Sequence, residues 1–266
     1  MRIAAFLLLL SCTFLPACFP PAPEAPRPAV SHPPEAIIAA LNAHPNHFPA
    51  FRSLIKASLT FPEGSKTKTQ SFDAVFLYRK EDQQFRLQGM DVLGRTHFDM
   101  TYKANELTIH LPPSEVTYSG DPANFPGVHG AGLFFILKKT MEGLPEGLDT
   151  TTVSFSETSG SAIIHEDQET YSLVEVNPQT LLIEKRTLVK RFQAVSEVRY
   201  WEYKRVGADF LPARIAVQLP AQKVSFQFTF DSFAPEETLP DSLFQIRPPA
   251  TAQQLPLSEL RMDFLF

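Results

Sequence analysis

Apolar and polar residues alternate along most of this chain beyond residue 55, and this alternation constrains the fold more than any other feature. In an extended strand successive side chains point to opposite faces, so alternation gives a sheet one apolar face and one wet face. The runs are 72–78, 98–102, 107–111, 161–165, 170–176, 181–189, 195–203, 210–219 and 224–230. Residues Ala104 and Asn105 join two of these runs in the manner of a hairpin. We therefore expect a mainly β fold of roughly eleven strands, in an antiparallel sheet with one solvated face.

The run 224–230 is the clearest. Phe226, Phe228 and Phe230 occupy one face of the expected strand, and Thr229 lies on the other. We expect the three rings to point inward. The chain has 23 phenylalanines against 6 tyrosines and 1 tryptophan, and phenyl rings carry no polar group. Such an interior suits either a cavity for lipid tails or a plain packed core.

Two or three helices should interrupt the strands. Residues 35–43 place Ile37, Ile38 and Leu41 on one face, and 48–54 could form a second short helical piece. A Gly/Pro-rich loop at 120–132 then precedes the run 133–141, whose apolar residues share one broad helical face. Gly143 and Pro145 should end that helix, which would act as a lid on the sheet.

The N-terminus is typical of a secretory signal. Arg2 precedes a short apolar core, and Leu15-Pro16-Ala17-Cys18 follows it. These four residues resemble the lipobox of bacterial lipoproteins, in which the cysteine is acylated and becomes the first residue of the mature chain. The resemblance implies a signal peptide at 1–17 and a lipid anchor on Cys18. An ordinary secretory signal and an N-terminal membrane helix are the alternatives, although the apolar run is short for a span of ~20 residues.

Residues 18–34 form a proline-rich linker after that cysteine. Because proline fixes φ and removes backbone donors, the segment should stay extended and reach roughly 45 Å from a bilayer. A proline-rich docking motif is the alternative. We find no second linker, so we expect one domain at 35–250 followed by a C-terminal tail at 251–266.

Charge and motifs argue against several functions. The net charge is -5 and no basic face is clustered, so nucleic-acid binding is not expected; the pairs Lys185-Arg186 and Lys190-Arg191 are interpreted as a solvated strand face. No Gly-x-Ser-x-Gly elbow accompanies the esterase-like turn at 129–132. His44 and His47 are separated by Pro45 and have no HExxH pattern. We expect no enzyme activity, no metal and no cofactor.

Several features together resemble the Lol-type fold, the group that includes the periplasmic lipoprotein carrier and the outer-membrane lipoprotein receptor. They are a helical entry, the strand with Phe72 and Phe76, the stretch 85–112, a mid-chain helix and a second meander, all behind a lipobox. The resemblance implies a half-open, curved antiparallel β-barrel with a helical lid and an apolar cavity for acyl chains. It covers about residues 35–247 and brings no catalytic residues.

On this hypothesis the protein binds a lipid or an acylated lipoprotein at a membrane surface. The expected lipid-binding residues are Leu133, Phe134, Leu137, Met141, Phe226 and Phe228. Phe125 is the nearest candidate for a partner-binding residue. Phe19 follows the cysteine where an aspartate commonly retains lipoproteins at the inner membrane, which favours the periplasmic face of the outer membrane, with the inner membrane as the alternative. The rival function is a non-catalytic envelope scaffold with a filled core.

Overall fold

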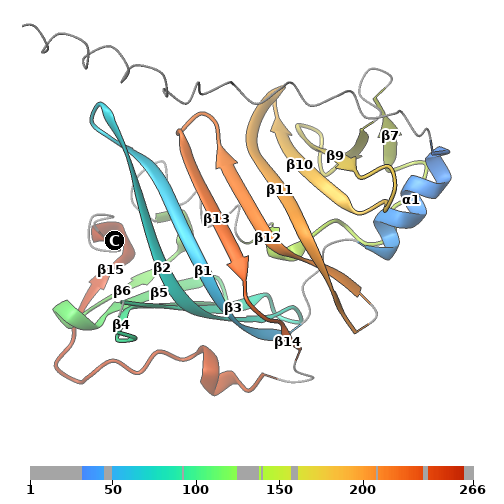
Figure 1. The fold of residues 1–266 in the computed structure, drawn as a ribbon. Coiled ribbons are helices and arrows are strands. Elements are labelled where there is room, and N and C mark those ends of the chain that lie inside the picture. The colour runs from blue at the N-terminus through green and yellow to red at the C-terminus, as the bar shows by residue number, and fades with distance from the viewer. Residues whose placement is uncertain are drawn as a thin grey trace, which may run out of the picture. The chain divides into compact units, whose positions relative to one another are not determined.

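One sheet contains all fifteen strands of the described residues in this computed structural model (Figure 1). The structure describes residues 32–44, 50–91, 93–124, 138, 140–156, 161–207, 209–235 and 239–260. The strands are β1 (Phe51–Glu63), β2 (Lys66–Arg79), β3 (Gln84–Met90), β4 (Thr96–Lys103), β5 (Glu106–Leu111), β6 (Val116–Gly120), β7 (Val153–Phe155), β8 (Ala162–His165), β9 (Thr170–Val176), β10 (Ile183–Lys190), β11 (Gln193–Val206), β12 (Asp209–Leu219), β13 (Val224–Phe230), β14 (Ala234–Pro235) and β15 (Gln253–Pro256).

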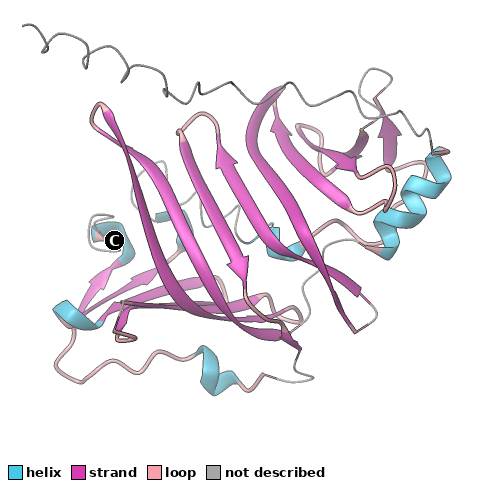
Figure 2. Cartoon of the chain, viewed as in Figure 1, coloured by secondary structure: helices cyan, strands magenta, loops and turns pink. Residues whose placement is uncertain are grey.

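Helices are few and short (Figure 2). They are α1 (Pro34–Ala43), the 3₁₀ helices η1 (Pro112–Ser114), η2 (Pro122–Asn124), η3 (Asp241–Phe244) and η4 (Leu257–Glu259), and helical residues at 138 and 140–142. The helix predicted at 35–43 is confirmed as α1, with Ile37, Ile38 and Leu41 buried. Two hydrogen bonds join the Asn42 side chain of α1 to the backbone of Leu148. Asn42 Nδ2 donates to the Leu148 carbonyl at 2.7 Å, and the Leu148 amide donates to Asn42 Oδ1 at 2.9 Å.

The strand order across the sheet is β15-β6-β5-β4-β3-β2-β1-β13-β12-β11-β10-β9-β8-β7, with β14 beside the start of β1. Neighbours are antiparallel, except that β15 runs parallel to β6. Strand β1 joins the two meanders, because it pairs with β2 on one side and β13 on the other. Among the described strands, β15 and β7 end the order without pairing to each other, so the sheet is open. The mainly β, open antiparallel fold predicted from the sequence is confirmed.

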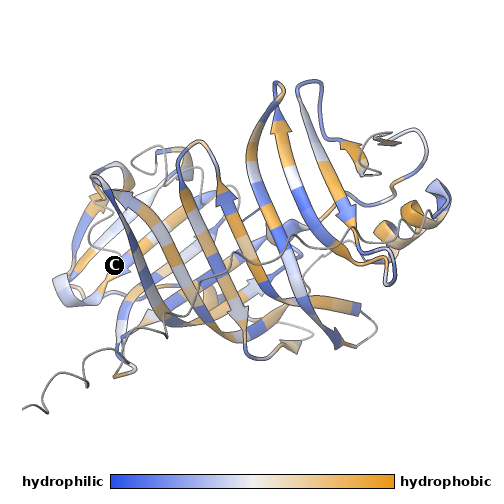
Figure 3. Cartoon of the chain, turned by 45° about the horizontal axis from the view of Figure 1, so that its top comes forward, coloured by the Kyte–Doolittle hydropathy of each residue, from blue (hydrophilic) through white to orange (hydrophobic). Residues whose placement is uncertain are grey.

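The register defines two faces. Ile55 of β1 lies opposite Phe230 of β13, and Ala57 lies opposite Phe228. These residues are buried on what we call the inner face. The outer face carries the alternate residues, among them Lys56 opposite Thr229. Figure 3 shows the resulting alternation of hydrophobic and hydrophilic residues along the strands. The inward orientation predicted for Phe226, Phe228 and Phe230 is confirmed.

The helical piece predicted at 48–54 is wrong from Phe51 onward, because β1 begins there. Phe51, Leu54 and Ile55 have helical spacing, but Leu54 lies on the outer face and remains 53 % exposed. The alternation of the strand is followed by the buried residues Phe51, Ile55 and Leu59. The exposed Leu54 departs from this alternation and makes the segment resemble a helix.

The connection at Ala104-Asn105 is confirmed as a two-residue hairpin, since Lys103 pairs with Glu106. Both turn residues have positive φ, 50° and 62°. That geometry matches the twist of the strands, and asparagine tolerates it. The Tyr102 hydroxyl also donates to Asn105 Oδ1 at 2.7 Å and stabilises the turn.

The C-terminal residues 239–260, which we call the C-terminal strap, cross the outer face and rejoin the sheet (Figure 1). Phe244 and Leu239 pack against Leu77 in a small second core. Beyond residue 250, the end of the predicted domain, the chain adds β15 to the sheet and buries Leu257 and Leu260. The strap therefore belongs to the folded unit as far as Leu260.

Candidate functional site

Phenylalanine rings from both meanders line the middle of the inner face. The ring centroids of Phe51 and Phe230 lie 6.0 Å apart, those of Phe51 and Phe76 5.7 Å, and those of Phe226 and Phe228 5.0 Å. These distances are typical of tilted aromatic pairs, which contribute beyond their buried area. These phenylalanines form what we call the aromatic wall, and their phenyl rings carry no polar group.

A small cavity lies between this wall and the helical turn at 140–142. It is lined by Ile55, Phe76, Leu87, Thr140, Met141, Ile215, Phe228 and Phe230. Its volume is about 10 Å³, which is room for about one water molecule. This cavity therefore leaves almost no free space beside the buried Met141 side chain.

The structure brings together two of the predicted lipid-binding residues, since Met141 and Phe228 line this same cavity. Phe226 is buried beside Phe228 on the same face. Leu133, Phe134, Leu137, Phe125 and Cys18 lie outside the described residues. The binding role of all these residues stays a prediction.

Three contacts hold the helical turn in place. The Lys138 ammonium lies over the Tyr102 ring, 5.6 Å from its centroid, and 3.5 Å from Glu142. Gly143 has a φ of 74° and ends the helix as expected, because a left-handed residue at this position favours glycine. Arg186 Nη1 donates to the Gly143 carbonyl at 2.8 Å, and a cation at a helix C-terminus also stabilises the helix dipole.

The interpretation of the pairs Lys185-Arg186 and Lys190-Arg191 as a solvated strand face is wrong for Arg186, which is buried. Its side chain is only 6 % exposed; its guanidinium contacts Glu166 at 2.6 Å and donates to Ser172 Oγ at 2.9 Å. A buried charge is tolerable only when paired in this way. The register places Arg186 opposite Val174 and Val198, on the inner face. In the sequence, the burial of Arg186 is indicated only by its position two residues before Leu188, which puts both side chains on the same face of the strand.

A larger hollow lies along β1, β2, β3 and β13. It is open, has a volume of about 660 Å³, and includes the outward-facing Lys56, Asp73 and Thr229. None of the residues predicted to bind lipid lines it. The apolar side chains of Phe72, Met90 and Phe98 also line this hollow.

In the described part of the chain, no group of three His, Cys, Asp or Glu side chains is arranged to hold a metal ion. In the same residues, the helices all fall short of the length and hydrophobicity that crossing a membrane requires.

Comparison with known proteins finds solved structures of similar fold. No protein-family model and no curated protein matches the sequence. Among solved structures, a DUF1329 family protein from Desulfovibrio piger is similar, with a TM-score of 0.50, 14 % identity, and 81 % of this chain and 98 % of that chain covered. A LolA superfamily protein from Nitrosomonas europaea has a TM-score of 0.49 and 11 % identity, and the match covers 81 % of this chain and 99 % of that chain. A putative outer membrane lipoprotein-sorting protein domain from Vibrio parahaemolyticus also has a TM-score of 0.49 and 11 % identity. This match covers 79 % of this chain and 94 % of that chain.

At these identities the likeness concerns the fold alone. The curved, open sheet with few helices agrees with the Lol-type resemblance of the sequence.

Proposed function

We propose that this protein is a membrane-anchored envelope protein that binds the acyl chain of a lipid or lipoprotein between the aromatic wall and the helical turn at 140–142. The cavity beneath Met141 carries the proposal. Seven of its eight lining residues are aliphatic or aromatic, and the eighth, Thr140, contributes one hydroxyl. An acyl chain placed there would leave water without exposing a charge to the apolar interior.

Entry of a chain requires that the Met141 side chain move aside. Methionine is unbranched and flexible, and it fills irregular gaps that other groups can also occupy. The aromatic wall behind it needs no rearrangement, since its rings are fixed by both meanders. The small cavity would then be the closed form of the site.

The anchor is the second part of the proposal and is supported by Leu15-Pro16-Ala17-Cys18. Acylation of Cys18 would attach the chain to a membrane without spanning it, and two or more acyl chains make such attachment stable. Phe19 after the cysteine favours the periplasmic face of the outer membrane. No catalytic step is proposed.

An envelope scaffold with a filled core is the second candidate, and the cavity volume of about 10 Å³ favours it. On this alternative the inner face only stabilises the fold. The protein would then dock its partner elsewhere on its surface.

Lipid binding by the full-length protein separates the two. Native mass spectrometry should find a co-purifying lipid, and the protein should take up a pyrene-labelled acyl chain offered as a fatty acid or as a monoacylglycerol. Met141→Ala should alter this uptake, whereas Leu107→Ala, a buried control outside the cavity, should only lower stability, by about 2–5 kcal/mol. If the wild-type protein carries no lipid and takes up neither probe, the lipid-binding proposal is wrong and the envelope scaffold is the remaining candidate.

A further inference from the structure

A pocket with a volume of about 230 Å³, lined by Leu144, Pro145 and several polar side chains, lies at the end of the helical turn at 140–142. The side chains that give it its chemistry are those of Tyr78, Lys80, Gln83, Glu142 and Glu146. No residue that lines it was singled out by the sequence analysis for binding.

Residues close together on two elements line this pocket and the apolar cavity. On β2, Phe76 lines the cavity, and Tyr78, two residues further on the same face, lines the pocket. On the helical turn, Met141 lines the cavity and the next residue, Glu142, lines the pocket. A ligand with an apolar tail and a polar head could therefore occupy both.

The Tyr78 hydroxyl is the group in this pocket that needs a partner. Tyr78 is only 2 % exposed, and within the described part of the chain its hydroxyl makes no hydrogen bond. A buried hydroxyl without a partner destabilises the fold, so its retention calls for an explanation. Burial, and then the nearby Glu142 and Asp82 carboxylates, raise the pKa of Tyr78, so the hydroxyl stays protonated and can donate.

The charges around the pocket select the kind of head group. Lys80, the one cation among its lining residues, is 3.1 Å from Glu146. Glu142 is 3.5 Å from Lys138. An anionic head group would find both cations already matched and would approach two carboxylates, whereas hydroxyl groups could donate to those carboxylates.

We infer that this pocket holds the head of a neutral acyl ester of the acylglycerol class, in preference to a fatty-acid anion. The Tyr78 hydroxyl donates to the ester carbonyl, and the free glycerol hydroxyls donate to Glu142 and Glu146. The inference rests on the proposed function, because the tail would occupy the cavity beneath Met141.

Two probes with the same acyl chain test the inference on the full-length protein. Equilibrium binding of monopalmitoylglycerol should be at least about tenfold tighter than binding of palmitate at neutral pH, since a like-charge contact opposes only the second. Equal affinities, or tighter binding of palmitate, would overturn the inference while leaving lipid binding intact. If neither probe binds, both the inference about the head group and the proposed lipid-binding function are wrong.

Tyr78→Phe tests the hydroxyl itself. The variant should lose roughly fivefold in affinity for monopalmitoylglycerol, the worth of one hydrogen bond, and should unfold at the same or a higher temperature because an unpaired buried hydroxyl is gone. Tyr203→Phe is the matched control: its hydroxyl donates to the Ile183 carbonyl at 2.6 Å, so this change should lower stability and leave the affinity unchanged. A folded Tyr78→Phe protein with unaltered affinity would overturn the assignment.

Discussion

Individual polar residues in the interior differ sharply in how they are satisfied. Arg186 has partners from Glu166, Ser172 and Gly143, so its charge is matched where it lies. The hydroxyls of Tyr78 and Thr140 have no hydrogen-bond partner in the described residues, although both residues are buried. Both lie beside the space proposed for a ligand, one in the pocket and one in the cavity.

At this scale we expect Phe228→Ala to lower the free energy of unfolding by about 3–5 kcal/mol, because its buried ring packs against a nearly filled cavity. Thr229→Ala, the neighbouring outer-face change, should stay within about 0.5 kcal/mol. Urea unfolding of both variants measures the difference. Similar losses at the two positions would contradict the inner and outer faces assigned to β13.

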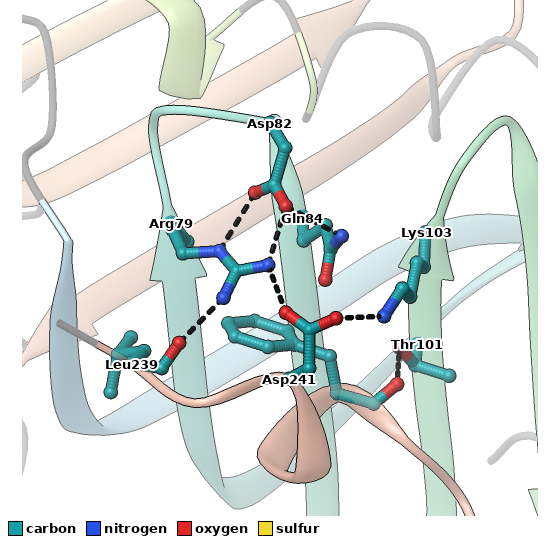
Figure 4. Close-up of polar contacts among 8 residues, drawn as sticks. Arg79, Asp82, Gln84, Thr101, Lys103, Leu239 and Asp241 are labelled. Carbon is teal, nitrogen blue, oxygen red and sulfur yellow. Dashed lines mark hydrogen bonds and ion pairs between the residues drawn. The ribbon is translucent and has the colours of Figure 1, made fainter.

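At the scale of elements, the C-terminal strap is held by ion pairs as well as by packing. Figure 4 shows Arg79 between Asp82, the Leu239 carbonyl and Asp241. Asp241 also accepts from Lys103 at 2.8 Å, and Thr101 donates to the Phe244 carbonyl at 2.9 Å. Charged groups on β2 and β4 thus fasten η3 to the outer face.

These ion pairs make strap attachment depend on pH. Hydrogen bonding to Arg79 lowers the pKa of Asp82, and hydrogen bonding to Lys103 and Arg79 lowers the pKa of Asp241. Because both values are depressed in the folded protein, their contribution is complete above about pH 4 and is lost as the pH falls through the lowered values.

We therefore expect Asp241→Asn to reduce the hydrogen-exchange protection of residues 241–245 at pH 7, with little change in the inner core. Wild type and variant should converge only when the pH falls below the lowered pKa of Asp241, because the wild-type carboxyl is protonated only there. Asp209→Asn, at the start of β12, serves as the control and should leave the strap unchanged. Equal strap protection in wild type and Asp241→Asn at pH 7 would show that packing alone holds η3.

At the scale of the whole molecule, the described residues belong to one unit that begins at His32. Its ring Nε2 lies 2.6 Å from the Pro178 carbonyl, so the unit starts within the last residues of the predicted linker. The single-domain hypothesis and the proposed anchor together predict a folded sheet joined to a membrane by one short, extended segment.

Cys18→Ser tests that arrangement in cells. Because serine offers no thiol for the thioether, the variant should incorporate no labelled fatty acid and should accumulate as an unprocessed precursor. Labelling of wild type and variant with radioactive palmitate, followed by membrane fractionation, measures both effects. Continued labelling of the variant would exclude Cys18 as the anchor.

Alternation along the strands was enough to predict the open antiparallel sheet, the inward Phe226, Phe228 and Phe230, and the hairpin at Ala104-Asn105. These features depend on local periodicity and turn chemistry, which neighbouring residues carry. The helical piece predicted at 48–54 was wrong from Phe51 onward, since β1 begins there and exposes Leu54 on its outer face although it lies in the interior of the strand order.

The sequence by itself determined which residues alternate and which turns could close. Only the tertiary structure decided that Arg186 faces inward onto Gly143 and that residues 253–256 return to pair with β6. It also decided that the Tyr78 hydroxyl lies near Glu142 with no hydrogen-bond partner among the described residues. Each of these depends on residues far apart in the chain, and no local period records which distant strand or helix end will meet a given side chain. The physical reason is that burial and pairing are properties of the assembled sheet, whereas alternation is a property of the single strand.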